Sequence, residues 1–233
     1  MQRHVRRGKA RAVTRLVVNE VFQTVQGEAT FTGTPAVFVR LQGCPVGCPW
    51  CDTKHTWKVK PEREVSVEAM IAKQADADTF AALTADELVS LVETYEARHV
   101  VITGGEPCLY DLERLTRLLQ DAGRTVQVET SGTQRVRVAP GTWVTVSPKL
   151  DMPGGCVVLP DALERADELK APIGKRADYE KLAARVLPLL RRGVAVWLQP
   201  LSQHPVATRL CVELATRHGH RVSVQVHKYL GLR

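Results

Sequence analysis

The chain has 233 residues, 44% of them hydrophobic, and a formal net charge of +7. A single domain of this size can bury roughly 70% of its unfolded surface. The chain lacks the run of about 18 apolar residues that a membrane span requires. Its first residues are too basic and polar for a secretory signal, so we expect a cytoplasmic protein without membrane association.

The positive charge is concentrated near the N-terminus. Six basic residues precede the first acidic residue, so residues 16–233 carry only 7 − 6 = +1: Arg3, Arg6, Arg7, Lys9, Arg11 and Arg15. We expect residues 1–15 to form a disordered basic extension and residues 16–233 to form one domain. Such an arm can neutralise phosphates. It has no aromatic residues to stack on bases, however, so direct nucleic-acid binding is not expected.

Strand-like and helix-like segments alternate along the chain. "AVFVRLQG" (36–43) is apolar, partly β-branched and bounded by turn residues, which predicts a buried strand. Helix-favouring polar residues dominate 66–96, and "HVVITG" (99–104) predicts a second strand. "DLERLTRLLQDAG" (111–123) predicts a helix closed by a C-terminal glycine.

The alternation continues to the C-terminus and indicates the fold class. Further strands are predicted at 125–132, 142–149, 168–173, 194–202 and 221–230, and further helices near 160–169, 178–191 and 204–218. A strand that returns parallel to its predecessor needs a crossover long enough for a helix, so the pattern predicts an α/β fold with mainly parallel strands. Polar or glycine-rich residues follow these strands, and in such folds they form the functional site.

The cysteines fall into two groups. Three stand singly among apolar neighbours, where a reduced cysteine commonly behaves as a small buried hydrophobe: Cys108, Cys156 and Cys211. We expect the thiols to be reduced, because nothing else in the sequence indicates secretion.

The other three cysteines share one short loop, "CPVGCPWC", as Cys44, Cys48 and Cys51. His55 could complete a closed zinc site with three cysteines and one histidine. Without a fourth ligand, the three thiolates suit a 4Fe-4S cluster with one iron left open. The spacing alone leaves both alternatives open.

Two motifs in order resemble the radical S-adenosylmethionine (SAM) enzymes. The cysteine motif has Trp50 directly before its last cysteine, and Gly104-Gly105-Glu106-Pro107 follows about fifty residues later. Six longer segments resemble one family within this superfamily, the 7-carboxy-7-deazaguanine synthases. These segments are residues 20–57, 99–107, 128–133, 143–150, 198–203 and 227–231. They include "TVQGEA", "TGGEP", "ETSGT", "VSPKL", "QPLSQ" and "HKYLG".

This resemblance implies a fold, a reaction and cofactors. The fold would be an incomplete (β/α) barrel of radical SAM type with a lateral opening, commonly in a homodimer. The reaction would convert 6-carboxy-5,6,7,8-tetrahydropterin to 7-carboxy-7-deazaguanine with release of ammonia, a step towards queuosine and other deazapurines. The cofactors would be a 4Fe-4S cluster, SAM and Mg²⁺, with flavodoxin or ferredoxin as electron donor.

The resemblance also assigns residues. Cys44, Cys48 and Cys51 would ligate the cluster, and Thr53 would bind Mg²⁺. The implied cofactor-binding residues are Trp50, Asp52, Gly105, Ser147, Pro148, Lys149, Gln199, Pro200, Leu201 and Ser202. The implied substrate-binding residues are Val25, Gln26, Gly27, Glu28, Arg40, Thr103 and His227.

One position departs from the family pattern. The family usually has Gln-Gly-Glu-Gly where this chain has Ala29 as the fourth residue, and alanine tolerates positive φ poorly. Two other functions are weighed beside the family assignment. One is a radical SAM activase of another enzyme, and the other is a zinc-stabilised nucleic-acid-binding protein.

Overall fold

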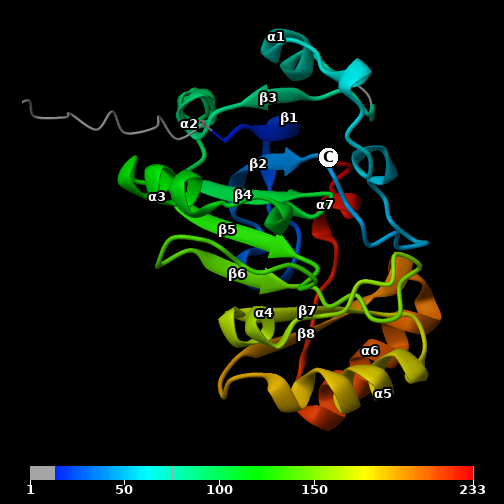
Figure 1. The fold of residues 1–233 in the computed structure, drawn as a ribbon. Coiled ribbons are helices and arrows are strands. Elements are labelled where there is room, and N and C mark those ends of the chain that lie inside the picture. Colours follow the sequence, from blue (N-terminus) through cyan, green and yellow to red (C-terminus); the bar gives the residue numbers. More distant parts are fainter. Residues whose placement is uncertain (1–13, 75, 233) are drawn as a thin grey trace, which may run out of the picture.

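The computed structural model describes residues 14–74 and 76–232, which form one nine-stranded sheet (Figure 1). The strands are β1 (Leu16–Val25), β2 (Pro35–Leu41), β3 (Ala81–Leu83), β4 (His99–Gly104), β5 (Thr125–Thr130), β6 (Trp143–Val146), β7 (Glu168–Ile173), β8 (Ala195–Pro200) and β9 (Arg221–Val222). Their order in the sheet is β3-β1-β2-β4-β5-β6-β7-β8-β9. Strand β1 pairs antiparallel with β2 and β3, and every other pair is parallel. The predicted α/β class with mainly parallel strands is confirmed.

The helices are α1 (Val67–Ile71), α2 (Ala85–Glu93), α3 (Glu113–Asp121), α4 (Pro160–Arg165), α5 (Arg176–Arg185), α6 (Pro205–His218) and α7 (Val226–Tyr229). Helices α2 and α3 form one group on the outer face of the sheet, and α4, α5 and α6 form another, whereas α7 contacts the loop that follows β1 (Figure 1). Leu88 of α2 and Leu119 of α3 are buried in one core with β1, β2, β4 and β5. Leu163 of α4, Leu182 of α5 and Leu214 of α6 are buried in a second core with β6, β7 and β8.

The helix ends follow local sequence signals. Thr84 caps α2 through a reciprocal capping box with Glu87. Helix α6 begins at Pro205 and ends at His218, and Gly219 caps it with a left-handed φ of 71°. Within the described residues, no helix is long and apolar enough to cross a membrane.

Three sequence predictions differ from the structure. Strand β1 was not predicted, and residues 66–96 contain strand β3 as well as two short helices, α1 and α2. The strand predicted at 221–230 ends at Val222, because Ser223 and Gln225 turn inwards to bond the β1–β2 loop and Val226 begins α7. Of the predicted extension at residues 1–15, residues 1–13 lie outside the described residues.

The loop between β1 and β2, residues 26–34, crosses the concave side of the sheet. Thr30 N donates to Glu168 of β7 at 3.2 Å. Ala29 N donates to Ser223 Oγ at 3.1 Å, and Val226 N donates to the Gly27 carbonyl at 2.9 Å. The sheet remains an open, incomplete barrel. Its expected lateral opening is bridged by these contacts between the β1–β2 loop and the C-terminal segment.

Ala29 adopts the left-handed conformation that its family position requires, with φ at 55°. We expect Ala29→Gly to change the free energy of unfolding by less than about 1 kcal/mol. Relief of about 1–2 kcal/mol of backbone strain is offset by losing a buried methyl worth about 0.8 kcal/mol and by the greater entropy of the unfolded chain. Urea titration measures the change.

A β-branched residue tests the same conformation from the other side. Ala29→Val should destabilise the protein by more than about 2 kcal/mol, since branching is poorly tolerated at positive φ and the site is only 4% exposed. A large change in the free energy of unfolding for Ala29→Gly, or no change for Ala29→Val, would contradict the assigned backbone conformation.

Candidate active site

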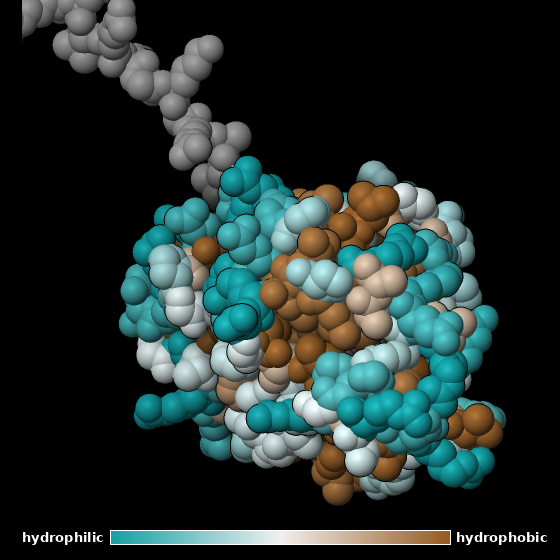
Figure 2. Space-filling model, turned by 90° about the horizontal axis from the view of Figure 1, so that it is seen from below, coloured by the Kyte–Doolittle hydropathy of each residue, from teal (hydrophilic) through white to brown (hydrophobic). Residues whose placement is uncertain are grey.

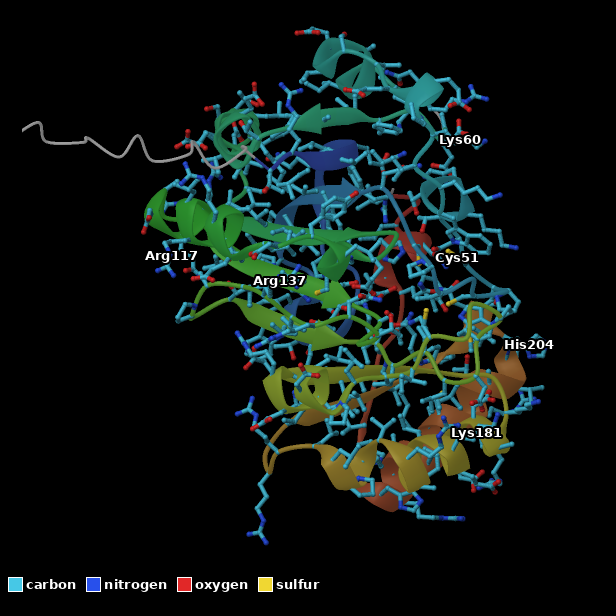
Figure 3. The ribbon with its side chains drawn as sticks, viewed as in Figure 1. Cys51, Lys60, Arg117, Arg137, Lys181 and His204 are labelled. Atoms are coloured by element: carbon cyan, nitrogen blue, oxygen red, sulfur yellow. The ribbon has the colours of Figure 1, made fainter. Side chains whose placement is uncertain are left out.

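A cavity of about 520 Å³ lies at the carboxyl ends of the parallel strands. In Figure 3, Cys51 lies at this end of the sheet, beside the loops that follow the strands. All but two of the residues assigned from the sequence line the cavity, the exceptions being Pro148 and Gly27. Those that line it are Val25, Gln26, Glu28, Arg40, Cys44, Cys48, Trp50, Cys51, Asp52, Thr53, Thr103, Gly105, Ser147, Lys149, Gln199, Pro200, Leu201, Ser202 and His227.

The cysteine loop begins three residues after β2 and is held at both ends. The Cys44 amide donates to the Trp57 carbonyl at 2.9 Å, and the Trp57 indole Nε1 donates to Cys51 Sγ at 3.4 Å. The three cysteines on this loop are free thiols. Their sulfurs therefore belong to one short segment whose ends are fixed by the residues around Trp57.

The glycines after β4 pack directly against this loop. The Glu106 amide donates to the Gly43 carbonyl at 2.7 Å. A Cβ on Gly105 would lie well inside 3.0 Å of the Gly43 carbonyl, and its next neighbour would be the Cys44 Cβ. Glycine at 105 is thus required for the close approach of the two backbones.

Glu106 braces the ends of two strands. Its buried carboxylate accepts hydrogen bonds from the amides of Cys108 at 3.0 Å and Ser131 at 2.8 Å, and from Thr130 Oγ1 at 2.6 Å. It also accepts from the Ser131 hydroxyl. The carboxylate is occupied by protein donors, so its role here is to hold the loops after β4 and β5 together.

The opposite side of the cysteine loop packs on residues 153–156. Gly154 N donates to the Val46 carbonyl at 3.0 Å, and a Cβ on Gly154 would overlap the Pro45 carbonyl. The Cys156 thiol lies 3.7 Å from that carbonyl and is only partly buried, so the prediction of a buried Cys156 was wrong. The same prediction is confirmed for Cys108 and Cys211.

Burial changes the pKa values of two cysteines on the loop and of Lys149. Burial raises the pKa of the Cys44 thiol to about 11 and also raises the pKa of the Cys48 thiol. A bound metal ion deprotonates such thiols. Burial lowers the pKa of Lys149, whose ammonium donates to the Ser147 carbonyl at 3.0 Å. Within the part of the chain that the structure describes, Lys149 forms no salt bridge. An anionic ligand group would pair with it.

The donor set fits a cluster better than closed zinc. His55 does not line the cavity; its Nδ1 lies 3.9 Å from Asp76, and its buried Nε2 has no hydrogen-bond partner. Among residues 14–74 and 76–232, no three histidine, cysteine or acidic side chains gather around one point as a preformed metal site. Three thiols on one loop that line the cavity, with His55 outside it, match a 4Fe-4S cluster with an open iron.

Thr53 lies beside this loop. Its hydroxyl is 3.6 Å from Cys51 Sγ and does not cap the short helix that begins at Lys54. A capping role, the ordinary alternative for a threonine in a turn, is therefore absent. Thr53 lines the cavity, where a hard cation would find an oxygen ligand.

The wall formed by β1 and β2 carries Arg40. Its Nε donates to Glu20 at 2.6 Å, and its guanidinium lies 5.9 Å from the ring centre of Phe22. Phe22 stacks on Phe38 at 5.5 Å. The ion pair orients the guanidinium, and planar aromatic surface lies beside it in the cavity.

Several cavity residues were not assigned from the sequence. Two of them, Glu129 and Lys170, form an ion pair, with Lys170 Nζ 3.0 Å from Glu129 Oε2. The others include Phe22, Phe38, Trp57, Ser131 and Gln225. A signal for Lys170 was present, because a lysine inside the apolar strand "ELKAPI" shares a face with Glu168 and must find a partner when buried.

Comparison with known proteins agrees with this geometry. The model of the radical SAM superfamily matches residues 38–140. The chain is 52% identical to 7-carboxy-7-deazaguanine synthase of Escherichia coli (strain K12), covering 92% of this chain and 98% of that protein. It is 39% identical to the synthase of Buchnera aphidicola subsp. Schizaphis graminum over 93% of this chain and 98% of that one.

The structural comparison gives the same result. The crystal structure of QueE from Escherichia coli superposes with a TM-score of 0.88 at 52% identity, covering 91% of this chain and 95% of that chain. The chain belongs to the 7-carboxy-7-deazaguanine synthase family. As a member of this family it is a radical SAM enzyme, and the incomplete barrel expected from the resemblance is confirmed.

Proposed function

We propose that this member of the 7-carboxy-7-deazaguanine synthase family converts 6-carboxy-5,6,7,8-tetrahydropterin to 7-carboxy-7-deazaguanine and releases ammonia. One observation carries the proposal. A single cavity joins the three cysteines, the polar residues after β6 and β8, Arg40 of β2, and the carboxylates of Glu28 and Glu129. The cavity volume of about 520 Å³ suits small molecules, which favours this reaction over the activation of a protein substrate.

The cysteine side of the cavity would hold the cofactors. Cys44, Cys48 and Cys51 would ligate the 4Fe-4S cluster, which together with SAM supplies a 5′-deoxyadenosyl radical when bound. Gly105 lines the cavity next to the cysteine loop, where its backbone packs against Gly43. The buried Lys149 ammonium would pair with a cofactor carboxylate, with Ser147, Gln199 and Ser202 as further polar contacts.

The opposite side would hold the pterin. The Arg40 guanidinium, already oriented by Glu20, can clamp the substrate carboxylate through its remaining nitrogens. Glu28 and Glu129 would accept hydrogen bonds from ring N–H groups, and Gln26 and His227 flank them. Thr53 would give Mg²⁺ one hard oxygen ligand, while substrate and water complete its octahedron.

Further features of the proposal concern the protein's surroundings. We expect a homodimer, a flavodoxin or ferredoxin as electron donor, a cytoplasmic location and no direct contact with nucleic acid. Figure 2 shows an apolar area among polar residues on the face seen from below. Such an exposed area is compatible with a subunit contact. Light scattering of the purified protein measures the oligomeric state directly.

An anaerobic assay tests the function. The reconstituted protein is mixed with 6-carboxytetrahydropterin, SAM, Mg²⁺ and a reductant, and the ring-contracted product is detected by mass. The zinc alternative predicts one zinc ion, no iron-sulfur absorption, and salt-sensitive nucleic-acid binding that requires the N-terminal arm. A protein that carries the cluster and cleaves SAM but yields no ring-contracted product would overturn the proposed reaction.

A further inference from the structure

Lys170 lies at the centre of a buried charge cluster on the cavity wall. It projects from β7, and its ammonium contacts Glu28 and lies 3.0 Å from Glu129. The side chain of Lys170 is 6% exposed, and those of Glu28 and Glu129 are 13% and 18% exposed. One buried cation is therefore shared by two carboxylates that come from the β1–β2 loop and from β5.

Each carboxylate is also held by amide donors. Glu28 Oε1 accepts from Gln225 at 2.7 Å and from Gln199 at 3.3 Å. Glu129 Oε1 accepts from Gln26 at 3.0 Å. The bonds leave lone pairs on both carboxylates, since an ionised carboxylate has about four acceptor sites. Both residues line the cavity, so a ligand can reach those sites.

The lysine decides the charge of this cluster. Burial raises the pKa of Glu28, but the ammonium of Lys170 outweighs it and, with the hydrogen bonds from Lys170 and Gln225, holds that pKa at about 2. Burial lowers the pKa of Lys170, and the charges of Glu129 and Glu28 more than reverse this effect. Without the lysine, two buried carboxylates would face each other, and like charges in a shared site cannot both stay ionised easily.

We propose that Lys170 is a positioning residue that fixes Glu28 and Glu129 as paired anionic acceptors for the donor edge of the substrate's aminopyrimidinone ring. This inference rests on the proposed function. In the pterin, the 2-amino group and N3–H are neighbouring donors, and a carboxylate accepts from such a pair in parallel. Two carboxylates and one lysine leave this wall with one net negative charge, which suits donors.

The position of the cluster opposite Arg40 gives the substrate a direction. Arg40 lies on β2 and Lys170 on β7, with β4, β5 and β6 between them in the sheet. A pterin bound through its carboxylate to Arg40 would present its aminopyrimidinone end to the cluster. The Lys170 cluster thus selects ligands that have donors at that end and rejects those with an acceptor there.

The test compares two ligands on the wild-type protein and on three variants. The ligands are 6-carboxytetrahydropterin and its 2-oxo analogue, in which an acceptor replaces the 2-amino group. We expect the wild type to bind the pterin about 100-fold more tightly, because a buried charged acceptor facing another acceptor is left unpaired. Equilibrium dialysis gives both Kd values, and turnover gives KM and kcat.

Lys170→Met is expected to raise the Kd and KM for the pterin about 10- to 100-fold, with a smaller change in kcat. It should also reduce the preference for the pterin over the 2-oxo analogue to less than about 10-fold. Lys60→Met is the control, because Lys60 forms an exposed ion pair with Asp78 and lies outside the cavity. It should match the wild type in every measurement. SAM cleavage without pterin should be unchanged in Lys60→Met.

The double variant Lys170→Met with Glu129→Gln separates positioning from folding. It removes one positive and one negative charge, so thermal stability should recover relative to Lys170→Met alone, while the preference for the 2-amino ligand should not. Recovery of that preference together with stability would show a merely structural lysine and overturn the inference.

The wild-type measurements test the role of the Lys170 cluster even if Lys170→Met does not fold. Equal affinity for the two ligands in the wild type would overturn the role of the cluster while ring contraction of the pterin continues. Failure of the proposed function has a different signature, in which the wild type neither binds nor converts the pterin. Unchanged pterin affinity in a folded Lys170→Met variant would also overturn the inference.

Discussion

Cys48→Ala is expected to prevent formation of an intact iron-sulfur cluster and to abolish SAM cleavage. Cys48 is one of the three thiols proposed to ligate the cluster, so its loss leaves too few ligands. The loss should exceed the roughly 10- to 100-fold that removal of an outer-shell partner costs a metal site. Iron and sulfide content, visible absorption after anaerobic reconstitution and 5′-deoxyadenosine formation measure it.

Cys211→Ala is the matched control. Cys211 is fully buried in the second core with α6, outside the cavity. The same substitution there removes one sulfur from a packed core and should cost about 1 kcal/mol of stability, with iron content and activity retained. A Cys48→Ala protein with wild-type iron content and absorption would remove the cysteine loop from the proposed site, and radical chemistry there would have to be abandoned.

Gly154→Ala is expected to displace the cysteine loop. The added Cβ would overlap the Pro45 carbonyl and would also lie close to the Val46 carbonyl. Both are backbone groups, which cannot move aside as a flexible side chain can. Overpacking of this kind costs about 1–3 kcal/mol. The strain falls directly next to Cys44, so the cluster should be lost faster to an iron chelator. The decay of visible absorption and the thermal unfolding temperature report the two effects separately.

The neighbouring glycine provides the control for this substitution. Gly155 has φ at 68°, and a Cβ there would meet no atom within 4 Å. Gly155→Ala therefore adds backbone strain of about 1–2 kcal/mol without contact with the cysteine loop. Equal rates of cluster loss in the two variants would mean that residues 153–156 do not hold the loop.

The cysteine loop and the strand-end segments could be predicted from the sequence because their chemistry is local. Three thiols within eight residues must lie on one loop, and the glycines after β4 must follow a buried strand. The parallel pattern then places "TGGEP", "VSPK" and "QPLS" at one end of the sheet. All three segments contribute residues to the cavity, as expected.

The antiparallel and C-terminal elements could not be predicted in the same way. Strand β1 pairs with β2 and β3, and its partner β3 has only three residues, from Ala81 to Leu83. The alternating "RVSVQV" segment is typical of a strand, yet Ser223 and Gln225 bond the β1–β2 loop and end the ladder. In both places tertiary contacts override local propensity.

The sequence by itself determined the fold class, the cysteine loop and the family to which the chain belongs, since these depend on residue types at short spacing and on a regular alternation of elements. Only the tertiary structure decided which buried charges meet. Lys170 pairs with Glu28 across 142 residues and with Glu129 across 41 residues. Neither spacing has a repeating period that a sequence could display. The pairing arises because a buried ammonium must find carboxylates wherever the curved sheet brings them within reach.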